Sequence, residues 1–325
     1  MDYRGLTVKY KVNRPLTTKE DDFHMLQNEP SRSKPLYQEQ IIRMNSTYLE
    51  CVDRFFMVKG FMLAVMIFAT GVSIWFIYFG LLIASEDQLY VGGSVIFFFG
   101  SIMLFINIKF FLLKECFTYT HFPIRFNRKT RKVHVFRRNG TVMTEDWEKL
   151  YFTLCPCQED EWEVRGNRMD KDGITVLETF ALPFADSLNR NRSTSKTWSF
   201  WEFVRRYMEE PDELPALADQ VESVIDIADK REGFGNGFGR LFGVLGMLGV
   251  LLIFIWGPIC FVYAIGRAIA MYTSKIPKWP AEIEAECKIE PDDPYLRDGE
   301  HLAQPPEPEK TENQEGGSWS PYGNE

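Results

Sequence analysis

The sequence predicts a membrane α-helical protein with three transmembrane segments and a cytoplasmic α+β domain between the second and the third. Three observations support this fold class. Residues 61–85 and 90–108 contain no charged side chain, a third uncharged run lies between Arg240 and Arg267, and short alternating apolar patterns fill the region between. A hydrocarbon core about 30 Å thick needs about 20 apolar helical residues, so each uncharged run is long enough to cross it.

The first membrane element is expected to be a helical hairpin over residues 57–113, preceded by a polar cytoplasmic extension over 1–56. The connection at 85–90 is long enough only for a turn. Arg54 and Lys59 precede the hairpin, Lys109 and Lys114 follow it, and its connection has no basic residue. Because cytoplasmic flanks carry the excess of lysine and arginine, both flanks are predicted to be cytoplasmic.

A strand-rich cytoplasmic domain is predicted for residues 114–210. Alternating patterns favour strands at 117–126, 132–137, 141–142, 151–154, 161–165 and 174–182, and Asn139-Gly140 is typical of a tight hairpin turn. Apolar residues at helical spacing then predict one closing helix that ends before Pro211. This order resembles the pleckstrin-homology-like domain of bacterial membrane proteins. A strand-rich sandwich packed by the helix fits the same pattern.

The third membrane element is expected after a linker over residues 211–240 that ends in a glycine-rich hinge. Residues 241–272 predict a transmembrane helix kinked at Gly257-Pro258, since proline removes a backbone hydrogen bond. A re-entrant hairpin that folds back at Gly257-Pro258 is the alternative. Small residues at steps of four and three predict close packing on the hairpin or on a second copy of the chain, unless glycine is simply common in membrane helices. These residues are Gly239, Gly243, Gly246 and Gly249.

The tail over residues 273–325 is acidic and partly of disordered composition. It holds 13 acidic and 5 basic residues, whereas residues 1–272 hold 32 of each sign. A third crossing places this tail in the periplasm. Trp279, Asp292, Asp293 and Tyr295 are its candidate partner-binding residues. The balanced remainder of the chain argues against nucleic acid as a partner, because no excess of positive charge meets the phosphates.

A basic segment over residues 125–138 is the second candidate binding surface. Its seven basic side chains occur without an acidic one: Arg125, Arg128, Lys129, Arg131, Lys132, Arg137 and Arg138. On a hairpin that faces the inner leaflet, each would gain about 1 kcal/mol from anionic lipid. A solvated charged face that keeps the domain in the cytoplasm is the alternative interpretation.

No catalytic, cofactor or metal site is predicted. Cys155-Pro156-Cys157 lacks the two-residue gap of zinc knuckles and redox motifs, so two cysteines at a strand end are the favoured interpretation. The glycine-rich run at 233–239 precedes a membrane segment, whereas phosphate-binding loops lie between a strand and a helix. Four histidines and no Ser/His/Asp order leave little for acid–base catalysis, so we expect the protein not to be an enzyme.

Three segments together resemble a family of uncharacterised proteobacterial inner-membrane proteins associated with type VI secretion clusters. They are NSTYLECVDRFF at 45–56, FPIRFNRKTRKVHVFRRNG at 122–140 and IPKWPAEIEAECKIEPDDPY at 276–295. The resemblance implies an immunity or accessory protein that binds a toxin or a secretion component at the membrane. A membrane-anchored scaffold, whose cytoplasmic domain binds anionic lipid or another protein, is the alternative function.

Overall fold

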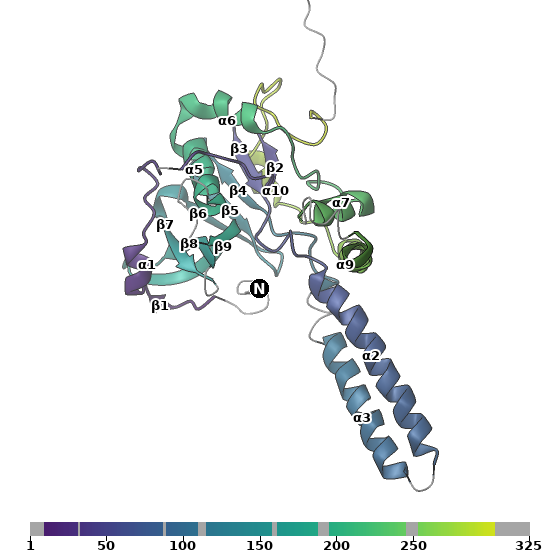
Figure 1. The fold of residues 1–325 in the computed structure, drawn as a ribbon. Helices are drawn as coiled ribbons and strands as arrows, with labels where there is room; N and C mark the ends of the chain where they lie inside the picture. The colour runs from purple at the N-terminus through teal and green to yellow at the C-terminus, as the bar shows by residue number, and fades with distance from the viewer. Residues whose placement is uncertain are drawn as a thin grey trace, which may run out of the picture.

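A computed structural model of the chain shows an α+β fold with two antiparallel sheets and a projecting helical hairpin (Figure 1). The structure describes residues 10–31, 33–86, 89–109, 115–157, 161–187, 195–244 and 253–302. Because the strands form two sheets, the predicted pleckstrin-homology-like domain with a single sheet is wrong.

The first sheet joins strands from both sides of the hairpin in the order β2-β3-β4-β5-β6. The strands are β2 (Ile41–Met44), β3 (Tyr48–Cys51), β4 (Ile124–Asn127), β5 (Lys132–Phe136) and β6 (Val142–Asp146). Strand β3 pairs with β4, so Cys51 lies opposite Ile124 although the hairpin separates them in sequence. The polar residues ahead of the hairpin thus supply two strands of this sheet.

The second sheet has the order β1-β9-β8-β7. Its strands are β1 (Arg14–Pro15), β7 (Leu150–Pro156), β8 (Glu161–Met169) and β9 (Thr175–Ser187). The Asn139-Gly140 turn between β5 and β6 is confirmed, since Phe136 pairs with Val142 across it. Gly140 has φ 84°, a left-handed conformation that a side chain disfavours.

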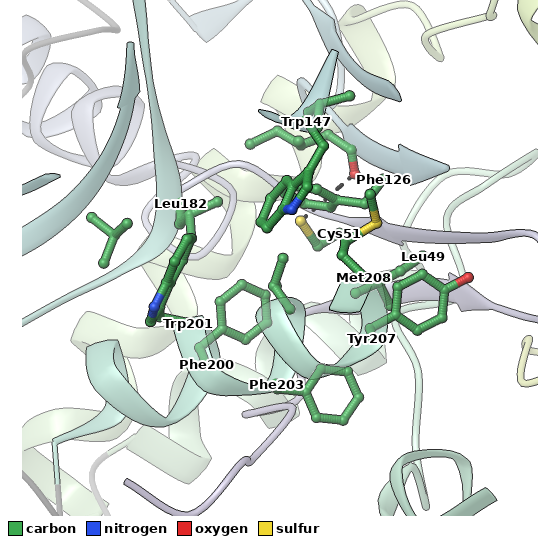
Figure 2. Close-up of a cluster of buried hydrophobic side chains, with 14 of the residues drawn as sticks. Leu49, Cys51, Phe126, Trp147, Leu182, Phe200, Trp201, Phe203, Tyr207 and Met208 are labelled. Atoms are coloured by element: carbon green, nitrogen blue, oxygen red, sulfur yellow. Dashed lines mark hydrogen bonds between the residues drawn. The ribbon is translucent and has the colours of Figure 1, made fainter. Parts of the chain in front are cut away.

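Helix α5 (Lys196–Glu209) packs against the sheets and confirms the predicted closing helix. Figure 2 shows its side chains meeting Trp147 and Leu182 in one apolar cluster. The ring centroids of Trp147 and Trp201 lie 5.9 Å apart, and those of Phe152 and Trp201 lie 4.7 Å apart. Each large side chain buried here contributes about 1.5–3 kcal/mol to stability.

The remaining helices join or flank these layers. In the domain they are α1 (Thr18–Asp22), α6 (Leu214–Gln220), α10 (Ala281–Glu286) and short 3-10 turns at Trp147–Lys149 and Pro211–Glu213. The hairpin consists of α2 (Phe61–Ala84) and α3 (Tyr90–Asn107), and α7 (Phe234–Val244) and α9 (Ile253–Thr273) lie near its base (Figure 1).

The predicted third transmembrane segment is wrong. Among the described residues, two helices are long and apolar enough to cross a membrane, namely α2 and α3. The region of the predicted third span instead contains α7 and α9, which pack against each other. Gly257-Pro258 lies inside α9, so the chain does not fold back at this point. The alternative of a re-entrant hairpin with its turn at Gly257-Pro258 is therefore also wrong.

Candidate functional site

Helices α2 and α3 leave most of their apolar side chains uncovered. Only 17% of the most apolar 18-residue stretch of each helix is buried. The two helices touch at glycines: a Cβ at Gly100 would lie 2.9 Å from the backbone nitrogen of Ile77, and one at Gly80 would lie 2.8 Å from the carbonyl oxygen of Gly93. Close glycine contacts of this kind are common where helices pack in lipid. Length and composition therefore suit a membrane hairpin.

Helix α9 crosses the start of α2 through a second glycine contact. Gly60 has φ 91°, and a Cβ at Gly266 would lie 2.8 Å from the carbonyl oxygen of Gly60. Arg267 is buried at this crossing, where its Nε donates a hydrogen bond to Glu232 at 2.5 Å. Its Nη1 donates to the carbonyl oxygens of Phe56 at 2.8 Å and Lys59 at 3.1 Å. Arg267 thus joins α9 to the start of α2 and does not mark a membrane boundary.

Arg125, the first residue of the predicted basic surface, is buried. Its guanidinium lies between two aromatic rings, 4.3 Å from the centroid of Tyr48 and 4.7 Å from that of Trp279. Its Nη2 donates to Glu50 at 2.9 Å, and Glu50 also accepts a hydrogen bond from the indole of Trp279 at 2.7 Å. Arg125 therefore connects strand β4 to the carboxyl-terminal segment.

Five other residues of the basic segment also contact groups of the same chain. Lys129 pairs with Glu290, Lys132 with Glu286, Arg131 with Glu148 and Glu209, and Arg137 with Glu178, while Arg128 lies over the ring of Tyr207. Arg138 is exposed, and its guanidinium makes no hydrogen bond or ion pair within the described ranges. Most of the positive charge of this segment is therefore neutralised internally.

Three of the four candidate residues in the tail also stabilise the fold. The backbone nitrogen of Ser46 donates to Asp293 at 2.7 Å, and that of Tyr295 donates to the same carboxylate at 2.9 Å. Tyr295 packs against the main apolar cluster, and Trp279 contacts Arg125 as described above. Asp292 is exposed, with φ 55°.

The predicted periplasmic location of the tail is wrong for its described part. Helix α10 hydrogen-bonds to β4, where Asn127 donates to the carbonyl oxygen of Glu286 at 3.0 Å. Met44 and Arg297 exchange backbone hydrogen bonds of 2.8 and 3.0 Å. Groups in direct hydrogen bonds cannot lie on opposite sides of a bilayer, so the tail up to residue 302 shares the compartment of the basic segment.

Of the four glycines predicted to pack helices together, two lie in α7 and two lie outside the described residues. Gly239 lies in α7 with open space around it, and Gly243 lies in the last turn of the same helix. Gly246 and Gly249 are outside the described residues. The close contacts occur at other glycines of the membrane-proximal helices, which the sequence analysis did not select.

The cysteines are all buried with free thiols. Cys155 and Cys157 lie at the end of β7, where burial raises the pKa of both thiols, that of Cys157 to about 11. A thiol with a raised pKa is a poor nucleophile and a poor metal ligand at neutral pH. Within the described residues, no group of three or more His, Cys, Asp or Glu side chains could hold a metal ion.

A buried charge cluster escaped the sequence analysis. Glu163 on β8 is fully buried and pairs with Arg54 and with Arg165, whose Nε lies 2.7 Å from it, and the hydroxyl of Tyr10 donates to it at 3.3 Å. The polar residues of β8 were visible in the sequence. Arg54 and Tyr10 lie more than a hundred residues away in the sequence, so no local pattern could reveal the cluster.

Two of the cavities in the described structure differ in their charge balance. One of about 380 Å³ lies between the two sheets, lined in part by Arg54, Phe122 and Phe180. Another of about 520 Å³ lies under the tail, where Arg43, Arg125 and Lys278 face Glu50, Asp229 and Glu284. The charges of the second cavity balance, whereas the first combines an apolar interior with Arg138, whose guanidinium makes no direct hydrogen bond or ion pair with the described residues. The first cavity is therefore the better candidate for a ligand.

Two buried histidines predict a loss of stability in acid. Burial lowers the pKa of His121 to about 3, assisted by the charge of Lys59, and burial lowers the pKa of His134 to about 4. The unfolded chain binds these protons near pH 6.5, so the free energy of unfolding should fall as the pH drops below 6.5. Two such groups give a slope of at most about 2.7 kcal/mol per pH unit between pH 6.5 and 5.

Thermal unfolding across this pH range measures the slope. The variant His121→Asn should reduce this slope by about half. An unchanged slope in His121→Asn would show that this ring does not titrate on unfolding.

One comparison with known proteins identifies a family. Residues 101–291 match the profile of a family of unknown function, DUF6708, and this match covers more than half of the chain. No curated protein and no solved structure matches the chain. The matched range includes strands β4 to β9, helix α5 and the tail segment that packs against β4. The chain therefore belongs to DUF6708, a family of unknown function.

Proposed function

We propose that the chain is a non-enzymatic protein anchored in the bacterial inner membrane by α2 and α3, where it binds a partner protein as an immunity or accessory component of type VI secretion. The observation that carries the anchor is the exposed apolar surface of the hairpin, which includes Phe68 and Phe98, 76% and 63% exposed. Water disfavours a contiguous apolar surface of this kind, and a bilayer would cover it. The secretion role rests on the family resemblance of the three sequence segments.

The partner would meet the two-sheet domain. Lys59 and Lys109 flank the hairpin on the side of the domain, and the positive-inside rule favours the cytoplasm for that side. Because the described tail packs on the same domain, its exposed residues would face the same compartment. A toxin or secretion component that reaches the cytoplasmic face is thus the partner that fits this arrangement.

Arginines in the middle of the hairpin should release the protein from the membrane. The double substitution Phe68→Arg and Phe98→Arg adds about 2.5–3.5 kcal/mol per residue to the cost of membrane insertion. The variant should leave the alkali-resistant membrane fraction, in which the unsubstituted protein remains. The matched control is Leu36→Arg with Ile174→Arg, two exposed apolar positions of the domain.

The same variants test the biological role. Cells that express the double hairpin variant should lose survival against isogenic attackers with active secretion, whereas cells with the control variant should survive as well as the wild type. Full survival with the protein in the soluble fraction would contradict the proposal.

A further inference from the structure

The cavity between the two sheets has an apolar interior. Strands β4 and β5 of the first sheet and β9 of the second form its walls. The apolar side chains that line it are Phe55, Phe122, Ile124, Val135, Phe136, Phe180 and Ala181. Its volume of about 380 Å³ is in the range of small-molecule sites, which are mostly apolar with a few polar groups that fix the ligand.

The charged groups at the cavity leave one cation open. Arg54 pairs with Glu163, and Arg137 makes two hydrogen bonds of 2.6 Å to the carboxylate of Glu178. The carboxylate of Asp53 accepts hydrogen bonds from the backbone nitrogens of Phe55 at 3.0 Å and Phe122 at 2.8 Å.

Arg138 is the cation that remains at the mouth of the cavity. It lines the cavity and is exposed to solvent. Its guanidinium makes no direct hydrogen bond or ion pair with the described residues, and the charge of Asp53, which lines the same cavity, acts on it without direct contact. A guanidinium binds carboxylate and phosphate groups in a bidentate manner. An acidic group on a ligand would therefore complete the coordination of Arg138.

The cavity also lies beside the base of the membrane hairpin. Asp53, Phe55 and Phe122 line both this cavity and a second, smaller one, which is further lined by Val58 and Lys59. Helix α2 begins directly after these residues, at Phe61. If α2 crosses the bilayer, the mouth of the cavity is near the headgroups of the leaflet that faces the domain.

We propose that this cavity binds an anionic amphiphile, with an acyl chain against the phenylalanines and a carboxylate or phosphate on Arg138. The apolar interior would remove the chain from water, and the arginine would select an acidic headgroup. This inference rests on the proposed membrane anchor, which brings the cavity to the source of such molecules. A free fatty acid and an anionic phospholipid share this chemistry.

Photocrosslinking of the full-length chain in phosphatidylcholine nanodiscs tests the proposal. One arm adds palmitate with a diazirine in its chain, and the other adds phosphatidylglycerol with the same diazirine acyl chain. After irradiation, mass spectrometry locates the label on peptides. Label on β4, β5 or β9 in the palmitate arm alone identifies a fatty acid, and label in the phosphatidylglycerol arm identifies a lipid.

Two variants connect the label to the cavity. Arg138→Ala should reduce labelling of these strands about tenfold, the effect of one lost charge-assisted contact. Ala181→Trp places a bulky side chain in the cavity and should abolish labelling. Arg128→Ala removes an arginine of the same basic segment that lies over Tyr207 and does not line the cavity, so its labelling should equal that of the unsubstituted chain. Circular dichroism verifies that each variant is folded.

The hairpin provides a separate readout of the anchor. Label on α2 and α3 together with unlabelled domain strands would overturn the amphiphile site and leave the anchor in place. Strand labelling that neither Arg138→Ala nor Ala181→Trp reduces would also overturn it. Label on the strands without label on α2 and α3 would support the cavity and contradict the anchor.

Discussion

Replacing Arg125 by methionine should lower the free energy of unfolding by about 3–5 kcal/mol and release the carboxyl-terminal segment. Arg125 is only 3% exposed, and its removal leaves the buried carboxylate of Glu50 without its cation. The substitution also removes the guanidinium between Tyr48 and Trp279, which joins the tail to β4. An unpaired buried charge is more costly than a lost surface pair, because water no longer solvates it.

Thermal unfolding in detergent and limited proteolysis measure the two effects. New cleavage sites between residues 275 and 302 should appear in the variant at a temperature where the unsubstituted chain resists the protease. The matched control is Lys149→Met, which removes an exposed ion pair with Asp146 and should leave the stability nearly unchanged, because water screens this pair. Equal stability of the Arg125 and Lys149 variants would contradict a structural role for the buried pair.

Replacing Gly60 by alanine should be similarly damaging at the crossing of α2 and α9. Gly60 has φ 91°, and a Cβ there would lie 2.8 Å from the Cβ of Arg267 and closer still to its backbone. Backbone strain and overpacking together predict a loss of about 3–5 kcal/mol. The displaced α9 would also lose the hydrogen bonds from Arg267 to the carbonyls of Phe56 and Lys59.

Gly71→Ala is the control in the same helix. No atom lies within 4 Å of a Cβ at Gly71, and its backbone is helical, so alanine there should be neutral or stabilise the helix by up to about 1 kcal/mol. Thermal unfolding of both variants in the same detergent gives the comparison. A Gly60 variant as stable as the Gly71 variant would show that the helices do not cross at this point.

Local patterns predicted several elements correctly. The uncharged runs at 61–85 and 90–108 became helices α2 and α3, because a long apolar run without proline has few alternatives to a helix. The helical spacing of Trp201, Val204 and Met208 identified α5, and Asn139-Gly140 identified the turn between β5 and β6. Each of these features depends on residues that are close in the sequence.

The third apolar run shows where hydropathy failed. Its length and composition suit a membrane helix, but the described parts form α7 and α9, which pack on each other, and α9 also packs on the base of α2. Arg267 was expected to mark the end of a transmembrane segment. It instead pairs with Glu232 in the buried crossing of α9 and α2. A sliding average of hydropathy contains no information on whether an apolar face meets lipid or another helix.

By itself the sequence determined the apolar hairpin, the strand-rich character of the middle region, the closing helix and the membership of an uncharacterised family. Only the tertiary structure decided that strands from before and after the hairpin pair in one sheet, that the basic segment is neutralised by carboxylates up to about 160 residues away, and that the tail returns to the same domain. Periodicity reports which face of an element is apolar. Charge pairing and sheet order depend on contacts between residues that are distant in the sequence. The entropy cost of bringing such residues together, and the energy of burying their charges, depend on the whole fold.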